Sequence, residues 1–330
     1  MRPYSTIASA ACSKRARASS RNELPNATNG VPLPRPVFLW LLRVAWITLP
    51  VTAGPAASAS LASWSDGPRV AGAVLLWGAW ALGLLATLAP RPIMLTALRV
   101  IAPAFVIAAV LVAIDGEAST IATVGAVVAT LVRALLASGH DIASAAANAI
   151  AYGDEQRYPL RVPPALFLGP LPGARLVVMA GVVAPVLLLA DGRIVVGVAA
   201  LLVGAGLVYV LSRSIDSLSR RWAVLVPAGF VVVDPLSLAD PTLFLREHVR
   251  HVAPEAPAAA ADGVLDLRLG ASAGSVSVRF DEAIELTRAA RGRHGGATVT
   301  TAEIMVAVVR RDEMLRKAAE RRLPVQQPVR

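Results

Sequence analysis

The stretch Ile194–Trp222 reads IVVGVAALLVGAGLVYVLSRSIDSLSRRW and divides the chain into two parts of different character. Its apolar run, Ile194–Leu211, contains no charged residue and is followed by Arg213, Arg220 and Arg221. This length is close to the roughly 20 residues with which a helix crosses a bilayer, and arginines at one end are typical of the cytoplasmic side. The sequence therefore predicts a membrane portion before this junction and a soluble portion after it.

The composition of the whole chain agrees with burial in lipid. Hydrophobic residues make up 55% of the 330 residues and charged residues only 16%, with a mean hydropathy of +0.60. Soluble domains carry about 25% charged residues. The net charge of +10 could indicate nucleic acid or anionic lipid. Because the basic residues cluster beside apolar runs, we interpret them as topology signals and expect no nucleic-acid partner. The single cysteine, Cys12, excludes an internal disulfide and a cysteine-based metal cluster.

Six apolar runs are candidate membrane spans, so the predicted fold class is an all-α membrane bundle of about six transmembrane helices followed by a small cytosolic β-rich domain. A helix rises about 1.5 Å per residue and crosses a hydrocarbon core about 30 Å thick. The fourth and fifth runs are the shortest and least certain to cross. Three of the runs contain proline, which neighbouring helices can accommodate. The predicted spans lie near residues 37–57, 70–89, 93–114, 119–136, 174–190 and 194–211.

The positions of arginine and lysine predict the orientation of these spans. Residues 1–36 hold six basic residues and one acid, have no hydrophobic periodicity, and are expected to form a disordered cytosolic tail. An even number of spans then places both termini in the cytoplasm of the cell. Four arginines lie within spans but toward the predicted cytoplasmic ends, where we expect their side chains to reach the headgroups: Arg43, Arg99, Arg133 and Arg175.

The connection 137–173 is the longest loop of the membrane portion. Its first half is rich in alanine with helical periodicity and ends at Gly153. Its second half is charged and then proline-rich, and we expect no regular element there, only a path along the membrane surface. The densest charge cluster near the membrane lies here. It is a candidate contact for a cytosolic partner, for the soluble domain or for a phosphate, and the alternative is a solvated loop with local ion pairs: Asp154, Glu155 and Arg157.

Residues 212–322 are predicted to form a compact β-rich domain, with 323–330 as a second disordered tail. Trp222–Val226 and Phe230–Val233 are β-branched runs around a turn, and Val264–Leu269 and Ser275–Phe280 alternate in polarity on either side of a Gly/Ala/Ser turn. About five strands are visible. A C-terminal helix is predicted to begin at Thr300, which with Glu303 forms a capping box. Strands followed by one helix are the order expected of a pleckstrin-homology-like barrel.

Three short motifs could carry chemistry, and each has a plainer interpretation. Residues 270–274 match G-x-S-x-G but lie between two predicted strands, which favours a hairpin turn over a nucleophile elbow. His248 and His251 form H-x-x-H without the zinc-protease pattern. His140 and Asp141 sit at the end of the fourth span, where helix termination is the simpler explanation. We therefore expect no enzyme and no catalytic, cofactor-binding or metal-binding residues.

Two further stretches are Tyr152–Arg161 (YGDEQRYPLR) and Arg221–Phe230 (RWAVLVPAGF), the second continuing to Asp240-Pro241. Both are similar to motifs of uncharacterised multi-pass membrane proteins of actinobacterial type. The resemblance covers roughly residues 37–285. It implies a bacterial inner membrane and a family without an assigned activity, and it transfers no catalytic residue to this chain.

Two functional hypotheses follow. The first is a scaffold, assembly or regulatory component that acts through its cytosolic domain on a protein partner or on the lipid bilayer. The second is a transporter or lipid-handling permease that uses the interior of the helix bundle. No acidic residue lies well inside a predicted span, although ion-coupled transporters usually bury one there. A membrane enzyme using His140, Asp141 and Asp154 is a third alternative.

Overall fold

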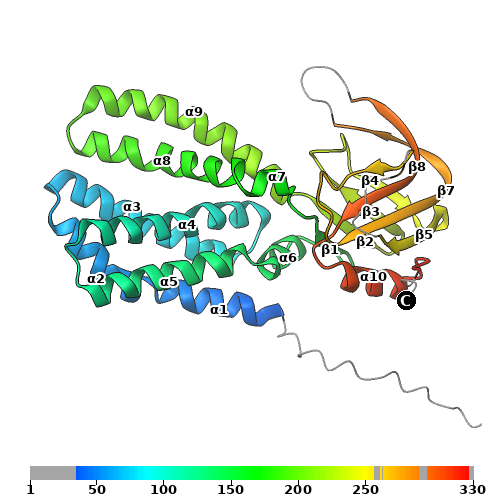
Figure 1. Ribbon diagram of the computed structural model, residues 1–330, viewed down its shortest axis with the longest axis horizontal. Helices are drawn as coiled ribbons and strands as arrows, with labels where there is room; N and C mark the ends of the chain where they lie inside the picture. Colours follow the sequence, from blue (N-terminus) through cyan, green and yellow to red (C-terminus); the bar gives the residue numbers. More distant parts are fainter. Residues whose placement is uncertain (1–34, 256–260, 262, 290–295, 327–330) are drawn as a thin grey trace, which may run out of the picture. The chain divides into compact units, whose positions relative to one another are not determined.

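A computed structural model describes residues 35–255, 261, 263–289 and 296–326 (Figure 1). The predicted N-terminal tail, apart from its last two residues, and the last four residues of the chain lie outside these ranges. The first part of the described chain is helical. Its helices are α1 (Arg35–Ile47), α2 (Leu49–Ala62), α3 (Asp66–Leu88), α4 (Pro92–Asp115), α5 (Thr120–Ser138), α6 (His140–Asn148), α7 (Pro164–Phe167), α8 (Pro170–Ala190) and α9 (Ile194–Ser219).

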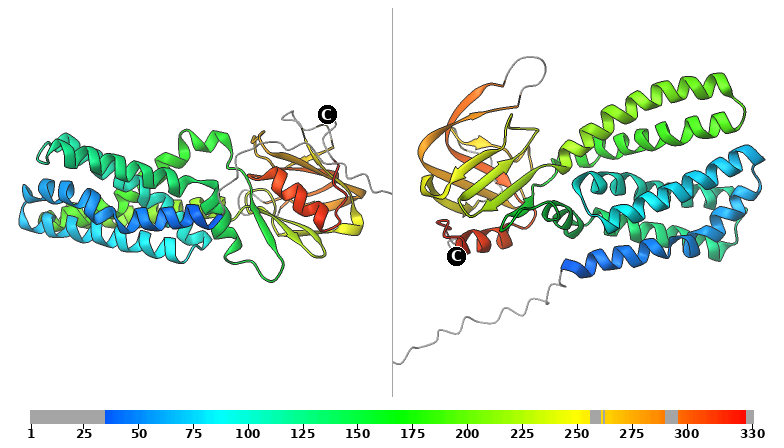
Figure 2. Two further views of the ribbon diagram at one scale, coloured as in Figure 1. Left: turned by 90° about the horizontal axis from the view of Figure 1, so that it is seen from below. Right: turned by 180° about the vertical axis from the view of Figure 1, so that it is seen from behind.

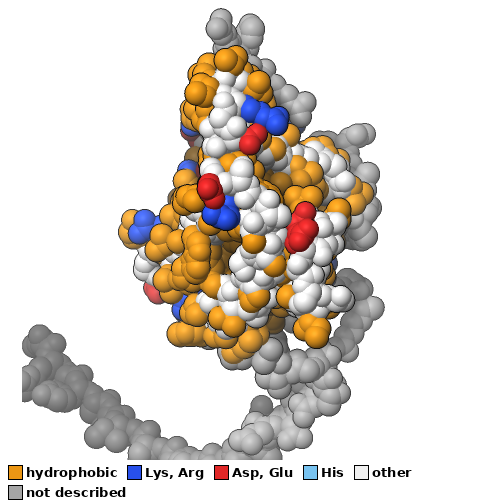
Figure 3. Space-filling model, turned by 90° about the vertical axis from the view of Figure 1, so that its left-hand side faces the viewer, with side chains coloured by type: hydrophobic (Ala, Val, Ile, Leu, Met, Phe, Trp, Pro, Cys, Tyr) orange, Lys and Arg blue, Asp and Glu red, His pale blue; other side chains and the backbone are white. Residues whose placement is uncertain are grey.

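Six helical segments are long and apolar enough to cross a membrane, which confirms the six predicted by the sequence. Two of them are composite: α1 and α2 together form Val37–Ala62, and α7 and α8 together form Pro164–Ala190. The fourth is Thr120–Ser138, and the fifth is ten residues longer than the predicted 174–190. Large apolar side chains point outward along these segments, such as Ile121 at 88% exposure. At the ends of the helices near the α2–α3 and α8–α9 connections, acidic and basic side chains lie among hydrophobic ones (Figure 3).

The first span is broken between α1 and α2, and two tryptophans compensate for the break. Pro50 has no N–H group to donate to the carbonyl of Trp46. The indole of Trp80 in α3 donates to this carbonyl at 3.0 Å. In return the indole of Trp46, whose side chain is fully buried, donates to the carbonyl of Trp80 at 2.9 Å. The bond from Trp80 satisfies a backbone carbonyl that Pro50 would otherwise leave unpaired in hydrocarbon, and the bond from Trp46 satisfies its own buried indole N–H.

Arg133 fills the other side of the same break, and its predicted exposure at the headgroups is wrong. Only 4% of the residue is exposed. Its guanidinium donates to the carbonyls of Ala45 and Ala129, both at 2.5 Å, and to the hydroxyls of Thr48 and Thr52 at 2.9 and 3.3 Å. The side chain turns inward because the irregular backbone near Thr48 offers it acceptors, which a regular helix would not.

The hairpin of α8 and α9 depends on two glycines that face each other. A Cβ atom on Gly204 would lie 2.7 Å from the carbonyl oxygen of Gly181 and 3.2 Å from its Cα. Small residues at such positions let two membrane helices approach until their backbones touch. A Cβ on Gly206, two residues along α9, would meet no atom within 4 Å. Close packing in this hairpin is therefore specific to one face of α9.

Replacing Gly204 by valine should push α8 and α9 apart, since the new side chain collides with backbone rather than with a movable side chain. We expect a destabilisation of about 1–3 kcal/mol, as for other overpacked sites. Spin labels on the exposed Leu176 and Leu207, in a Cys12→Ser background, would report a longer and broader distance distribution. The matched control is Gly206→Val. An unchanged distribution in Gly204→Val would contradict the packing described here.

The second part of the described chain is a β domain with one helix. Figure 2 shows its strands from two further directions. The strands are β1 (Gln156–Pro159), β2 (Trp222–Val226), β3 (Gly229–Val233), β4 (Thr242–Leu245), β5 (Val249–Pro254), β6 (Leu265–Asp266), β7 (Ser275–Thr287) and β8 (Thr298–Ala307). A single 3-10 turn, η1 (Arg246–His248), joins β4 to β5, and α10 (Arg311–Glu320) follows β8.

Two four-stranded sheets make up this domain. The first has the order β1-β2-β3-β4 and is antiparallel throughout. The second has the order β5-β7-β8-β6, in which β6 runs parallel to β8. The expectation that the second half of the 137–173 connection holds no regular element is wrong, because β1 lies there. Tyr158 of β1 pairs with Ala223 of β2, which follows α9 in the chain.

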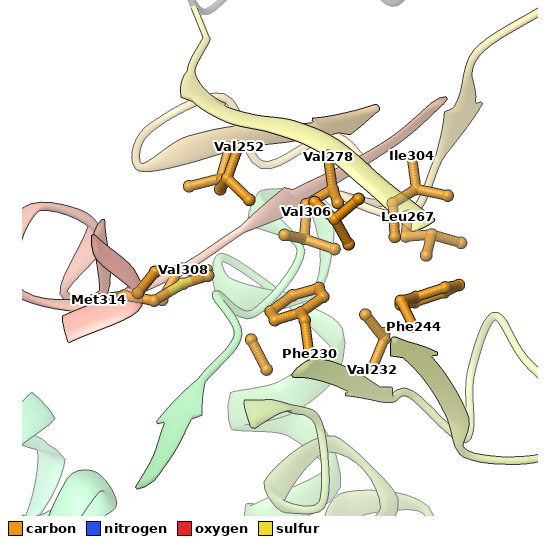
Figure 4. Packing of buried hydrophobic residues seen from close by; sticks show 14 of the residues in the cluster. Phe230, Val232, Phe244, Val252, Leu267, Val278, Ile304, Val306, Val308 and Met314 are labelled. Atoms are coloured by element: carbon orange, nitrogen blue, oxygen red, sulfur yellow. The ribbon is translucent and has the colours of Figure 1, made fainter. Parts of the chain in front are cut away.

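The core of the β domain lies between the two sheets. Phe230, Val232 and Phe244 extend from the first sheet toward Val278 and Val306 of the second (Figure 4). These five residues are at most 4% exposed. Alternate positions of each strand supply the core because successive side chains point to opposite faces. Near the edge, an isolated bridge between Leu160 and Val308 joins the two sheets.

Two further predictions for this domain are wrong. Residues 298–307 form strand β8, and the C-terminal helix begins only at Arg311. Thr300 and Glu303 match a capping box, but the β-branched run around them pairs along its length with β7. The segments 264–269 and 275–280 do not pair as a hairpin, because β8 lies between β6 and β7.

Candidate site between helices α4 and α8

The predicted interaction loop is largely engaged within the protein. Glu155 forms an ion pair with Arg157 at 3.1 Å, and the Arg157 guanidinium stacks over the ring of Trp222 at 5.1 Å from its centroid. The backbone of Arg157 exchanges two hydrogen bonds of 2.9 Å with the side chain of Asn148 in α6. The side chain of Asp154 is exposed, while its carbonyl accepts from Arg321 after α10. The loop thus fastens β1 to α6 and to the residue after α10, and of the three predicted residues only Asp154 has an exposed side chain.

The junction of α9 with the β domain contains a buried ion pair that the sequence did not reveal. Arg221 and Asp234 are bonded at two points, 2.7 and 2.8 Å, and their side chains are 1% and 0% exposed. Arg221 also donates to the carbonyls of Arg161 and Leu267. Such a fully bonded pair can be tolerated in the interior. It holds together three segments that are distant in the sequence, so we assign it a structural role.

Asp141 and His140 lie at the start of α6 beside the β domain. Asp141 forms an ion pair with Arg310, which also binds Glu313 at 3.0 Å. His140 faces the positive charges of Arg161, Arg99 and Arg310. Partial burial and these three arginines lower the pKa of His140 below its ordinary value of 6.5. The Asp141 carboxylate is therefore bound to Arg310. It does not form with His140 the acid–base pair that the enzyme hypothesis requires.

Acidification should destabilise the protein through His140. Its pKa is lowered in the folded state, so between that pKa and 6.5 the unfolded chain binds more protons, and stability falls as the pH drops through this window. In neutral detergent we expect a lower melting temperature at about pH 5.5 than at about pH 7.5. His140→Asn should reduce this loss. An identical loss in the variant would show that other groups carry the pH dependence.

Two of the arginines near His140, and a third that lies near one of them, have no acidic partner among the described residues. Arg99 lies in α4, Arg175 in α8 and Arg161 between β1 and α7. All three are half-buried, and the Nε atoms of Arg161 and Arg175 are buried without a hydrogen-bond acceptor. Arg99 is close enough to Arg175 for their charges to repel each other. A buried charge without a partner is costly, so this arrangement favours an anion beside it.

An apolar cleft of about 210 Å³ between α4 and α8 adjoins two of these arginines, Arg175 and Arg99. Arg175 contributes its side chain to the wall, and the residue after Arg99, Val100, lines the opposite side. The rest of the wall is apolar and continues along both helices. The remaining lining residues are Pro103, Ala104, Ile107, Pro172, Leu176 and Met179. A cluster of positive charge at one end of an apolar cleft can accept an amphiphilic anion.

The sequence named none of these arginines as a site. The sequence identifies Arg99 and Arg175 only as topology signals. The spacing of residues along the chain does not show which helices are neighbours in the fold. The other candidate motifs gain no chemistry from the structure. Ser272 of the G-x-S-x-G motif is exposed and its carbonyl accepts from Ser275, while His294, the histidine that follows this motif in the sequence, lies outside the described residues. His248 is exposed and lies 4.0 Å from Glu247.

The six apolar helices and the β domain indicate a multi-pass membrane protein with an attached β-sheet domain. In comparisons with known proteins, no family model, no curated protein and no solved structure matches the chain.

Proposed function

We propose that this protein is a scaffold, assembly or regulatory component of a bacterial cell membrane, with both termini and the β domain in the cytoplasm. The observation that carries the proposal is the way the β domain is mounted on the helices. β1 enters its first sheet from the loop after α6, and Asp141 of α6 binds Arg310 just before α10. A domain fastened in this way presents a partner with a surface in a fixed position relative to the membrane.

Several features support the domain type and the orientation. Seven strands, β2 to β8, follow α9 and are succeeded by α10, which is the order of a pleckstrin-homology-like domain. Arginines concentrate at the helix ends that adjoin the β domain, as the positive-inside rule expects of a cytoplasmic side. The resemblance to actinobacterial membrane proteins stays a prediction of the sequence. A reporter active only in the cytoplasm, fused after residue 330, would test the orientation.

The edge strand β4 is the surface we expect a protein partner to use. β4 is the last strand of its sheet, and Leu243 within it is 48% exposed. An unpaired strand edge can bind an extended segment of another protein by backbone hydrogen bonds. Asp154 and the loop around it lie at the other edge strand, β1, and offer a second contact of acidic character.

The experiment is purification of the tagged full-length protein in native-lipid particles, followed by mass spectrometry. We expect a stoichiometric protein partner that is lost with Leu243→Asp and retained with Leu269→Asp, a change at another exposed leucine of the same domain. A partner retained by both variants would exclude β4 as the contact. Turnover or solute movement by the purified chain alone would contradict the scaffold proposal.

A lipid-handling permease is the second candidate, favoured by one observation. The cleft between α4 and α8 is apolar along its length and carries Arg175 in its wall. Flipping of labelled lipids in vesicles reconstituted with the protein would support this function, and its loss on filling the cleft with Met179→Trp would locate it. Equal flipping in protein-free vesicles would exclude it.

A further inference from the structure

The acidic groups near the arginine cluster are already bound to other cations. Asp141 pairs with Arg310, Asp216 of α9 pairs with Arg220 at 2.7 Å, and Asp234 is enclosed with Arg221. Among the described residues none of these acids is left to neutralise Arg99 or Arg175. The two guanidiniums therefore form a region of excess positive charge within the protein, and a bound anion would relieve both their repulsion and their desolvation.

The depth of this charge matches the headgroup level of a bilayer. Arg99 is seven residues from the start of α4, about 10 Å along the helix, and Arg175 is five residues from the start of α8, about 8 Å. Both helices begin at the end where α9 finishes, because Thr96 of α4 bonds Ser219 of α9 at 3.1 Å. The arginines thus lie where a membrane helix passes from headgroups into hydrocarbon.

The cleft continues from these arginines toward the middle of the helices. On α4 its wall runs from Val100 to Ile107, and on α8 from Pro172 to Met179, with Arg175 as its only charged residue. Its 210 Å³ is less than the several hundred Å³ of a pocket that encloses a whole small ligand. The cleft therefore suits part of one acyl chain, with the rest of the molecule in the surrounding lipid.

We propose that Arg99 and Arg175 bind the phosphate of an anionic phospholipid, and that one acyl chain of this lipid lies in the cleft between α4 and α8. A free soluble phosphate would neutralise the arginines but would leave the adjoining apolar cleft unexplained. A zwitterionic lipid would bring a cationic group to a site that already has an excess of positive charge. The inference needs no protein partner, and it holds whether the lipid is transported or only retained.

The test is native mass spectrometry of the full-length protein in neutral detergent, titrated with phosphatidylglycerol or with phosphatidylcholine of identical acyl chains. We expect one phosphatidylglycerol to bind about tenfold more tightly than phosphatidylcholine. Arg175→Gln should remove this preference, since a hydrogen bond to a charged group contributes about one order of magnitude in affinity. Equal binding of both lipids to the unaltered protein would overturn the proposal.

Matched variants separate a lost site from a damaged fold. Arg43→Gln removes an arginine of another span, one that donates to the carbonyl of Thr87, and should leave the preference intact. Arg175→Lys keeps the charge and should retain most of the preference. Met179→Trp fills the cleft and should weaken the binding of phosphatidylglycerol, although it changes no charge. If Arg43→Gln reduced the preference for phosphatidylglycerol as much as Arg175→Gln does, the result would contradict a specific lipid site at Arg175.

Glycerol phosphate distinguishes the lipid from a soluble anion. If the site binds the lipid, glycerol phosphate at the same concentration should displace little phosphatidylglycerol, because it lacks the acyl chain. Full displacement, together with unchanged lipid binding in Met179→Trp, would assign the arginines to a soluble phosphate compound and overturn the lipid assignment.

Discussion

Replacing Asp234 by alanine is expected to destabilise the β domain by about 3–5 kcal/mol, because it leaves the charge of Arg221 buried without its partner. The two side chains are almost completely enclosed, and within the described part of the chain Arg221 has only the carbonyls of Arg161 and Leu267 as further acceptors. The loss would be a large part of the 5–15 kcal/mol by which a domain is usually stable.

Hydrogen exchange of the full-length protein in lipid nanodiscs measures this effect strand by strand. Amides of β2 and β3 should exchange about two to four orders of magnitude faster in Asp234→Ala, as follows from the expected free-energy change. The control is Glu320→Ala, which removes the exposed partner of Lys317 in α10 and should change exchange very little. Equal effects of the two variants would show that the buried pair contributes no more than a surface pair.

Replacing Gly83 by alanine should destabilise the helix bundle by about 1–3 kcal/mol, the cost of overpacking a filled core. A Cβ on Gly83 would lie 2.0 Å from the ring of Trp46. This ring cannot move aside freely, since it is fully buried, packs edge-on against Phe105 and exchanges hydrogen bonds with Trp80. Relief of the collision would break the contacts that compensate for Pro50.

The matched control for this prediction lies five residues earlier on the same helix. A Cβ on Gly78 would meet no atom within 4 Å, so Gly78→Ala should be neutral or slightly stabilising through its better helix propensity. Unfolding in mixed micelles with increasing sodium dodecyl sulfate would compare the two variants. A lower midpoint in Gly78→Ala than in Gly83→Ala would contradict the packing around Trp46.

The membrane helices could be predicted because their signal is local. A long apolar run such as Ile194–Leu211 specifies a span without knowledge of its neighbours. Strand β1 could not be predicted in the same way. It has four residues, ends in a proline, and pairs with a strand more than sixty residues later in the chain. Its sequence alone is indistinguishable from a loop.

The errors in the rest of the chain have a similar cause. The Thr300–Glu303 spacing satisfies a local rule for helices, yet pairing with β7 outweighs it. Arg133 was placed by distance from a helix end, whereas its position depends on acceptors exposed by a break in another helix. The site of Arg99 and Arg175 likewise exists only because α4 and α8 are neighbours. Each of these features requires tertiary contacts that no spacing encodes.

The placement of β1 also sets the order in which the chain can be assembled. The first strand of the β domain leaves the ribosome before α8 and α9, while its partner β2 leaves after them. The sheet can close only when the α8–α9 hairpin has entered the bilayer and returned, with both segments on the same side. A chain with one of these two spans missing would separate β1 from β2 by the membrane. Completion of the first sheet therefore requires that both α8 and α9 have been inserted.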